Sequence, residues 1–290
     1  MLLFNFIIFA NIQYRILISQ KPMSKINSFQ SAKVNEYIVN WLKSYVSGTS
    51  IKGFVVGISG GVDSAVTSTL CAQTGYPTLC IEMPIHQSAN QVSRGRAHIE
   101  QLKARFSNVS SIEADLTGSY DLFKNNLPEC EDESLYHLTL ANTRARLRMT
   151  TLYYFAGIHR SLVAGTGNKV EDFGVGFYTK YGDGGVDVSP IADLMKSEVY
   201  ALGRYLNIPE SIQQAAPTDG LFGDDRTDED QLGASYDELE WAMLENDKGA
   251  KADDFSGREK EVFETFKRLN TMNQHKMNPI PVCVVPMILK

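Results

Sequence analysis

The sequence contains no C-x-x-C pair, and none of its five histidines stands at zinc-ligand spacing beside a cysteine. Chemistry that needs a paired thiol or a persulfide is therefore disfavoured. The cysteines are Cys71, Cys80, Cys130 and Cys283. We expect them to be buried small apolar side chains in a reducing compartment, and we expect the protein to be cytoplasmic.

An excess of positive charge is also lacking. The chain carries 28 basic and 34 acidic residues, for a net charge of −6. This balance disfavours a nucleic-acid partner, which would need a large basic surface. Hydrophobic residues make up 43% and charged residues 21%, which excludes wholesale disorder, collagen-like sequence and a membrane bundle. A length of 290 residues allows one large domain or two small ones.

A long apolar run is found only near the N-terminus, at residues 2–10. Asn5 interrupts this run and Asn11, Gln13 and Arg15 follow it, so the segment falls short of the roughly 20 apolar residues that a membrane span needs. A secretory signal would need a basic start and a small-residue cleavage site, and neither is clear here. We expect residues 1–22 to be a dispensable extension, with a targeting peptide as the alternative, and residues 23–290 to be the functional domain.

After residue 23, helical and strand patterns alternate. The sequence predicts strands at residues 53–58, 78–83, 109–114 and 161–165, and helices at 28–46, 63–73, 88–106, 117–126 and 133–157, with Ser88 as an N-cap. This order predicts a single-domain α/β fold, a doubly wound parallel sheet with helices on both faces. Ligands bind such sheets at the carboxyl ends of the strands. Residues 218–230 are expected to form a mobile surface loop, and the remainder to about residue 268 to be helical and polar.

The segment after the first predicted strand, residues 57–64, reads GISGGVDS. Its glycines allow close backbone approach, and the helix that follows points its first N–H groups at the same place. It is neither a Walker A loop nor a G-x-G-x-x-G motif. Asp63 would repel a phosphate unless a metal ion bridged them. The alternative is a tight glycine turn with a capping aspartate.

Two further segments carry candidate chemistry. Residues 165–171 (GTGNKVE) follow the fourth predicted strand, and residues 176–187 (GFYTKYGDGGVD) form a glycine-rich loop long enough to be a lid. Residues 142–148 (NTRARLR) precede that strand on the long helix. The alternatives are a solvated glycine-rich connection and a solvated basic helix face.

The hexapeptide SGGVDS resembles the signature of the ATP pyrophosphatases, which cleave ATP between its α- and β-phosphates. The chain also contains the motifs N-x-x-A-R-x-R-M, G-T-x-N-x-x-E, G-F-x-T-K-Y-G-D-G-G-x-D, PIADLMK and T-D-E-x-x-L-G-x-x-Y. These motifs carry a further resemblance: from about residue 27 to 286, the chain is similar to the NAD synthetase family. The resemblance implies an adenine nucleotide α-hydrolase-like fold. It also implies a ligase that makes NAD from deamido-NAD, with ATP as co-substrate and Mg²⁺ as cofactor.

The resemblance also implies a role for each matched residue. The ATP-binding residues would be Gly57, Ile58, Ser59, Gly60, Gly61, Val62, Asp63, Ser64, Thr166, Lys196 and Thr218. Asp63 and Glu171 would hold Mg²⁺. The deamido-NAD-binding residues would be Arg146, Lys180, Asp187, His275 and Lys276. Lys196 would act catalytically on the phosphates, and Asp183 would orient ammonia or take its proton.

The family is homodimeric, so the apolar faces of residues 28–46 and 133–157 are candidate interfaces, with ordinary core as the alternative. Only about 50 residues precede the ATP loop, too few for a domain that makes ammonia from glutamine. Free ammonia is therefore the expected nitrogen donor, with ammonia from a separate glutaminase partner as the alternative. Two alternatives stay open: an ATP pyrophosphatase that adenylates another substrate, such as a tRNA base, and a nucleotide-binding module without turnover.

Overall fold

The computed structural model describes residues 29–87, 89–128, 130–217 and 227–290. The chain separates into a unit of residues Met1–Gln30 and a unit of residues Ser31–Lys290, and the second unit carries the fold. Residues 1–22 lie outside the described residues, so their dispensability stays a prediction. Within the described ranges, no helix combines the length and the apolar character of a membrane span.

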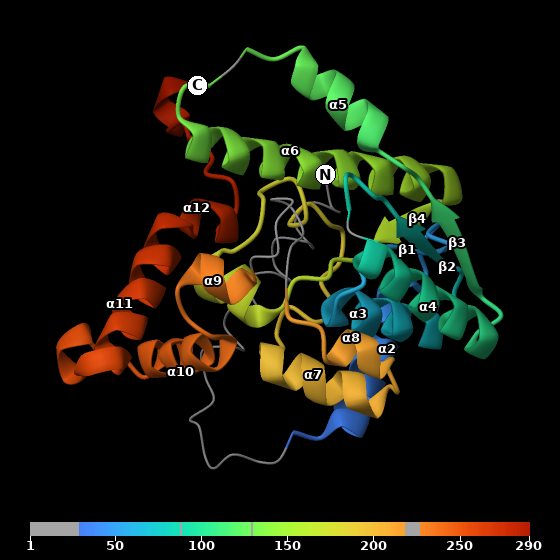
Figure 1. Cartoon of the computed structure of the whole chain (residues 1–290), viewed down its shortest axis with the longest axis horizontal. Coiled ribbons are helices and arrows are strands. Elements are labelled where there is room, and N and C mark those ends of the chain that lie inside the picture. Colours follow the sequence, from blue (N-terminus) through green and yellow to red (C-terminus); the bar gives the residue numbers. More distant parts are fainter. Residues whose placement is uncertain (1–28, 88, 129, 218–226) are drawn as a thin grey trace. The chain divides into compact units, whose positions relative to one another are not determined.

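Four parallel strands form the centre of the fold. They are β1 (Gly53–Gly57), β2 (Thr78–Glu82), β3 (Val109–Glu113) and β4 (Ser161–Val163), in the order β3-β2-β1-β4 (Figure 1). The four predicted strands are confirmed, and each ends one or two residues earlier than expected. The carboxyl ends of β1 and β4 are therefore neighbours, and the GISGGVDS and GTGNKVE segments leave the sheet side by side.

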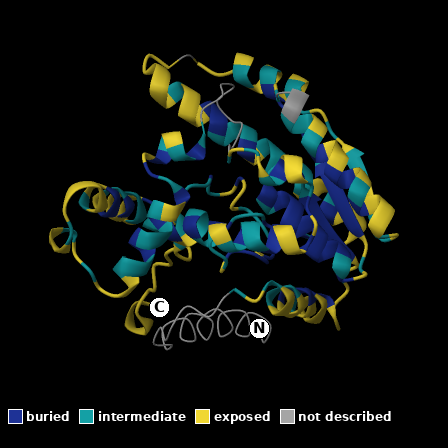
Figure 2. Cartoon of the chain, turned by 60° about the horizontal axis from the view of Figure 1, so that its bottom comes forward, coloured by how far each residue is buried: buried dark blue, intermediate teal, exposed yellow. Residues whose placement is uncertain are grey.

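Helices cover both faces of this sheet. Val55 and Ile81 pack against Leu152 and Ala156 of α6 (Glu133–His159), which covers one face. Helices α3 (Val62–Gln73) and α4 (Ala89–Arg105) contact the strands from the other side, as Figure 1 shows. Figure 2 shows the buried strands between helices whose outer sides are exposed. The predicted doubly wound α/β architecture is confirmed, whereas the expected N-cap Ser88 lies outside the described residues.

A second group of helices extends the fold beyond β4. It comprises η1 (Val170–Val175, a π-helical turn), α7 (Lys196–Tyr205), α8 (Glu210–Gln213), α9 (Asp228–Leu232), α10 (Tyr236–Asp247), η2 (Ala252–Asp254), α11 (Gly257–Met272), α12 (Gln274–Met277) and η3 (Met287–Leu289). A core cluster that includes Val175, Leu239, Met243, Phe263 and Phe266 joins η1 to α10 and α11. Helix α2 (Ser31–Val46) packs on α3 and α7, and α5 (Thr117–Asn125) packs on α6.

Two expectations need correction. Cys71 and Cys80 are buried as expected, but Cys130 and Cys283 are exposed, since they lie in an irregular segment before α6 and in the C-terminal tail. The expected loop at residues 218–230 ends earlier. Thr227 caps α9 by accepting a hydrogen bond from the Asp230 N–H, so the helix begins at Asp228. Residues 218–226 lie outside the described residues.

Candidate active site

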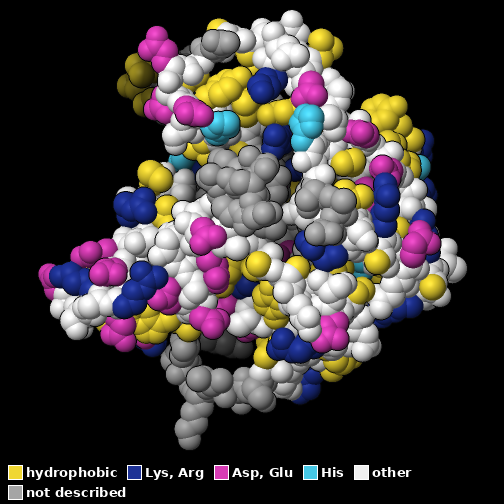
Figure 3. All heavy atoms as spheres, in the orientation of Figure 1, with side chains coloured by type: hydrophobic (Ala, Val, Ile, Leu, Met, Phe, Trp, Pro, Cys, Tyr) yellow, Lys and Arg dark blue, Asp and Glu magenta, His cyan; other side chains and the backbone are white. Residues whose placement is uncertain are grey.

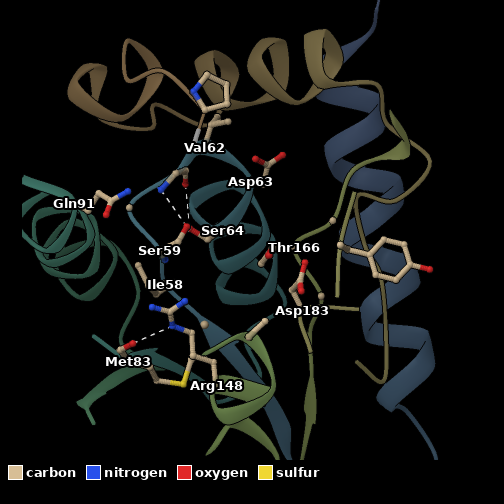
Figure 4. Close-up of a pocket in the computed structure, with 18 of the residues that line it drawn as sticks. Ile58, Ser59, Val62, Asp63, Ser64, Met83, Gln91, Arg148, Thr166 and Asp183 are labelled. Carbon is tan, nitrogen blue, oxygen red and sulfur yellow. Dashed lines mark hydrogen bonds between the residues drawn. The ribbon is translucent and has the colours of Figure 1, made fainter. Parts of the chain in front are cut away.

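The loop of residues 57–64 connects the carboxyl end of β1 to α3 (Figure 4). The Ser59 and Ser64 hydroxyl oxygens lie 3.1 Å apart, and Ser64 Oγ donates to the Gly61 carbonyl oxygen at 3.0 Å. Gly61 caps α3 without a side-chain hydrogen bond, so the first N–H groups of the helix face the loop. Such N–H groups and hydroxyls suit an anion such as a phosphate.

Gly60 is the most constrained position of this loop. Its φ of +82° favours glycine, and a Cβ atom here would stand 2.6 Å from the Gln91 carbonyl oxygen of α4. Arg94, also on α4, donates from Nε to the Gly60 carbonyl oxygen at 3.3 Å. Helix α4 therefore packs directly on the loop and fixes its shape.

Asp63, Glu171 and Lys196 form a buried ion triad at the cavity. Lys196 Nζ lies 2.6 Å from Asp63 Oδ2 and 3.1 Å from Glu171 Oε1, and the lysine side chain is 4% exposed. Burial alone would lower the pKa of Lys196, but Asp63 and Glu171 raise it above its usual range. The ammonium therefore stays charged between the two carboxylates.

Asn168 binds the carboxylate of Asp63 and the backbone of Glu171. This residue is fully buried, and its Nδ2 donates to Asp63 Oδ1 at 3.2 Å. Its Oδ1 accepts the N–H groups of Val170 and Glu171, the first two residues of η1, at 3.1 and 3.2 Å. One amide thus aligns a residue of α3 with a residue of η1.

The triad fits the expected magnesium ion. Asp63 and Glu171 already converge on one cation, the Lys196 ammonium. Among the described residues, no group of three or more His, Cys, Asp or Glu side chains is arranged around a metal position. Mg²⁺ is commonly bound by one or two carboxylates together with substrate phosphates and water, so two protein ligands are sufficient beside ATP.

The loop of residues 176–187 is pinned by α6. Arg146 donates from Nε and Nη2 to the Lys180 carbonyl oxygen at 3.4 and 3.3 Å. Asn142 Oδ1 accepts the Thr179 hydroxyl at 2.6 Å. Asp187 accepts the Tyr153 hydroxyl at 3.0 Å.

Helix α12 holds the same loop from another side. Lys276 Nζ donates to the carbonyl oxygens of Gly176 and Tyr178, both at 2.8 Å. Lys180 Nζ donates in return to the carbonyl oxygen of His275. The loop is therefore not simply a solvated glycine-rich connection, because hydrogen bonds from both lysines to backbone carbonyl oxygens tie it to α12.

The predicted site residues divide into two groups. Residues 57–64, Thr166, Glu171, Asp183 and Lys196 line one cavity. Arg146, Lys180, Asp187, His275 and Lys276 do not line it; they contact the loop of residues 176–187 or one another, as described above. Thr218 lies outside the described residues. The individual ligand roles of all these residues remain predictions.

The cavity also includes residues that the sequence did not mark as site residues. Arg148 donates from Nε to the Met83 carbonyl oxygen at 3.1 Å and from Nη2 to Gln87 Oε1 at 2.7 Å (Figure 4). Arg144, which does not line the cavity, stacks over Tyr120 with its Cζ 4.9 Å from the ring centre. The alternative of a solvated basic face is wrong for these two arginines. Tyr120 lies 24 residues from Arg144, and Met83 lies 65 residues from Arg148, so the spacing of residues along the helix could not predict these contacts.

Comparison with known proteins identifies the family. The family model for NAD synthase matches residues 34–280. The chain belongs to the NAD synthase family. The NH(3)-dependent NAD(+) synthetase of Carboxydothermus hydrogenoformans is 38% identical over 243 residues, 83% of this chain and 93% of that protein. That of Mesoplasma florum is 38% identical over 247 residues, 84% of this chain and 93% of that protein.

Solved structures of similar proteins agree with the fold. The NMN synthetase from Francisella tularensis superimposes with a TM-score of 0.75 at 29% identity, covering 90% of this chain and 100% of that one. The NH3-dependent NAD synthetase from Campylobacter jejuni gives a TM-score of 0.70 at 25% identity, covering 88% of this chain and 100% of that one. The resemblance to the NAD synthetase family is thus confirmed.

Replacing Lys196 by methionine is predicted to lower turnover more than ATP affinity. An ammonium that acts mainly on charge developing in the transition state contributes little to ground-state binding. We expect the rate of pyrophosphate release to fall at least about 100-fold, and the dissociation constant of ATP to rise less than about tenfold. Stopped-flow pyrophosphate detection and calorimetry measure the two quantities.

The matched control is Lys169→Met, which removes a neighbouring ammonium that pairs with Asp193 at 3.0 Å. Lys169 does not line the cavity, so both quantities should stay near their original values. An equal loss of ATP affinity and turnover in Lys196→Met would contradict the transition-state role.

Proposed function

We infer that this member of the NAD synthase family catalyses the ATP-dependent amidation of deamido-NAD with ammonia. The main support is that the GISGGVDS loop and the Asp63–Glu171–Lys196 triad line the same cavity. The family model for NAD synthase matches this chain over residues 34–280. The nicotinate carboxylate attacks the α-phosphorus of ATP, and pyrophosphate leaves. Ammonia then attacks the carbonyl carbon of the acyl-adenylate, AMP leaves and one proton is lost.

The chain's own groups serve the first step. The loop of residues 57–64 binds the β- and γ-phosphates, and Thr166 and Thr218 contact ATP. Lys196 weakens its ion pairs with Asp63 and Glu171 and instead neutralises negative charge on the phosphates. Mg²⁺ held by the two carboxylates would supply charge stabilisation on the phosphate oxygens.

The second substrate site is assigned around the loop of residues 176–187. Arg146, Lys180, Asp187, His275 and Lys276 cluster there, and we propose that they bind deamido-NAD. Their contacts with this loop support the proposal, because a loop cross-linked to α6 and α12 presents its polar groups in a fixed arrangement. The positive charges of Arg146, Lys180 and Lys276 suit the dinucleotide phosphates.

A second candidate substrate is the nicotinic acid mononucleotide. The NMN synthetase from Francisella tularensis covers 90% of this chain with a TM-score of 0.75. Its product is the amide of that mononucleotide. Amidation of the mononucleotide would use the same phosphate loop and triad, because the reacting carboxylate is identical.

The assay that tests the function supplies Mg-ATP and ammonium with either deamido-NAD or nicotinic acid mononucleotide. We expect the amide product and stoichiometric pyrophosphate from deamido-NAD, with a kcat/KM at least about tenfold above that for the mononucleotide. Glutamine in place of ammonium is expected to give no product. The reverse preference would favour the mononucleotide function, and no product from either substrate would contradict both.

We further propose that Asp183 takes the proton from ammonia as the amide forms. It faces the cavity, and its Oδ1 accepts the Thr179 N–H at 2.9 Å. Removal from bulk water raises the pKa of Asp183 to about 6; the Thr179 N–H and Lys276 oppose this rise, and Glu171 adds to it. A carboxylate with this pKa is ionised near neutral pH and is a stronger base than an ordinary aspartate.

The rate of amide formation, measured at a constant concentration of free ammonia, should therefore fall as the pH drops through about 6, where Asp183 becomes protonated. In Asp183→Asn we expect this acid limb to disappear and kcat to fall about 100-fold or more. Asp193→Asn, which changes an exposed carboxylate outside the cavity, should keep the limb. An unchanged limb in Asp183→Asn would rule out this role.

We also propose that the chain forms a homodimer through α6. On its surface Leu135, Leu138, Tyr154 and Ile158 are 50–64% exposed. Figure 3 shows hydrophobic side chains at the surface around α5 and α6. A helix that is apolar on several sides is normally covered, and a second copy of the chain is the partner that the family implies. The exposed Tyr37 and Tyr45 make α2 the second candidate face.

Analytical ultracentrifugation should give twice the chain mass for the unaltered protein. Leu138→Glu and Tyr154→Glu each place a charge on the α6 surface and should shift the protein toward the monomer. Tyr205→Glu, a control at an exposed tyrosine of α7, should leave the mass unchanged. A monomeric unaltered protein, or dimers in both α6 variants, would contradict this interface.

A cytoplasmic location is our proposal for the cellular compartment. The four cysteines are free, and Cys130 and Cys283 are exposed, which suits a reducing environment. Cell fractionation tests it, and recovery outside the cytoplasmic fraction would contradict it.

A further inference from the structure

Tyr236 lies directly beside the ion triad. Its hydroxyl lies 2.5 Å from Glu171 Oε1 and 3.3 Å from Asp228 Oδ2. The hydroxyl has one proton, and the shorter distance assigns it to Glu171. Lys196 Nζ stands 4.7 Å from the centre of the Tyr236 ring, within the range of a cation–π interaction. One side chain thus touches two members of the triad.

The core of the C-terminal helices fixes this side chain. Tyr236 is 4% exposed, and its ring belongs to the core cluster with Leu239, Met243 and Phe263. Its backbone N–H donates to Glu229 Oε1 at 2.9 Å at the start of α10. The hydroxyl therefore has little freedom to follow Glu171 if that carboxylate moves.

We propose that Tyr236 is a positioning residue that holds Glu171 for metal binding and weakens its ion pair with Lys196. Glu171 Oε1 accepts hydrogen bonds from Tyr236 and Lys196. No described residue donates a hydrogen bond to Oε2, so this oxygen is the one that a metal ion would take. This proposal rests on the metal role that the proposed function gives to Glu171.

The physical reason is competition between cations. Without the hydroxyl, Lys196 is the remaining donor to Glu171 Oε1 among the described residues. The carboxylate then rotates toward the ammonium, and a closer ion pair must break before a metal ion binds. The Tyr236 hydroxyl thus weakens the Lys196–Glu171 ion pair, because it donates to the same oxygen, Glu171 Oε1, as the ammonium.

The test uses Tyr236→Phe, which removes the hydroxyl and keeps the ring. Mn²⁺ affinity is measured by electron paramagnetic resonance on the full chain in complex with α,β-methylene-ATP, which the enzyme cannot cleave between the α- and β-phosphates. We expect the Mn²⁺ dissociation constant to rise about tenfold or more, as for other residues that orient metal ligands. The affinity for α,β-methylene-ATP without metal should change less than twofold.

Tyr120→Phe is the matched control, because Tyr120 is a buried tyrosine, 3% exposed, that does not line the cavity. It should leave the Mn²⁺ affinity unchanged. Equal Mn²⁺ affinities in Tyr236→Phe and the unaltered enzyme would overturn the proposal, provided that thermal denaturation shows both to be folded.

Glu171→Gln separates this proposal from the proposed function. If Tyr236 acts through Glu171, Glu171→Gln weakens Mn²⁺ binding, and adding Tyr236→Phe weakens it no further. Losses that multiply in the double variant would overturn the positioning role alone. Unchanged Mn²⁺ affinity in Glu171→Gln would overturn the metal assignment and, with it, the role of Tyr236.

A second measurement keeps the hydroxyl and so does not depend on the stability of Tyr236→Phe. A single 3-fluorotyrosine at position 236 provides one ¹⁹F resonance. We expect this resonance to shift when Mg²⁺ is added to the nucleotide complex, and to stay in place when Glu171 is replaced by glutamine. The absence of a shift in the protein that retains Glu171 would overturn the proposal.

Discussion

The site depends on one buried ammonium ion. Lys196 stands at the start of α7 and binds Asp63 of α3 and Glu171 of η1, so it joins three elements that are far apart in the chain. Taking three charged groups out of water is costly, and mutual attraction repays it only when each group has further hydrogen bonds. Asn168 and Tyr236 supply those bonds. Such an arrangement is better explained by the chemistry of phosphates than by a need for stability.

The same ammonium explains how a site for ATP can be acidic. Two carboxylates beside the loop of residues 57–64 would repel a nucleotide, but the Lys196 ammonium, whose pKa they raise, balances one of the two negative charges. In the proposed function, a metal ion would take the place of the ammonium between the two carboxylates, and Lys196 would then neutralise charge on the phosphates. Under that proposal, the charges of the triad would be arranged for Mg-ATP before it binds.

Much of this arrangement could be predicted from the sequence, and the rest could not, for a clear physical reason. The strands and the GISGGVDS loop follow from local patterns, because a buried strand and a glycine turn are encoded by adjacent residues. The joint placement of Asp63 and Glu171 follows from β1 and β4 being neighbours. Tyr236 is different: its motif was visible, but its bond to Glu171 spans 65 residues and depends on how α10 packs on η1. Tertiary packing of this kind leaves no periodic signal.

The hydrogen bonds that tie the loop of residues 176–187 to α6 and α12 could not be predicted from the sequence either. Lys180 and Lys276 matched family motifs as charged ligands, yet both ammonium groups bind backbone carbonyls. The carbonyl partners are invisible in a sequence, because every residue has one. An anion that binds at these lysines must therefore either break their hydrogen bonds to the carbonyl oxygens, which would loosen the loop, or interact with the ammonium charges while those hydrogen bonds stay intact.

The close contact at Gly60 has a consequence for how the family can diverge. A side chain at this position is barred twice, by the positive φ and by the Gln91 carbonyl oxygen, and the second barrier belongs to a different helix. A change that shifts α4 therefore also shifts the loop of residues 57–64, because the two are in direct contact. Insertions before α4 would be tolerated only where they leave the path of its first two turns unaltered. The diversity of nucleotide-using relatives is then expected in the loops around this contact, and not within it.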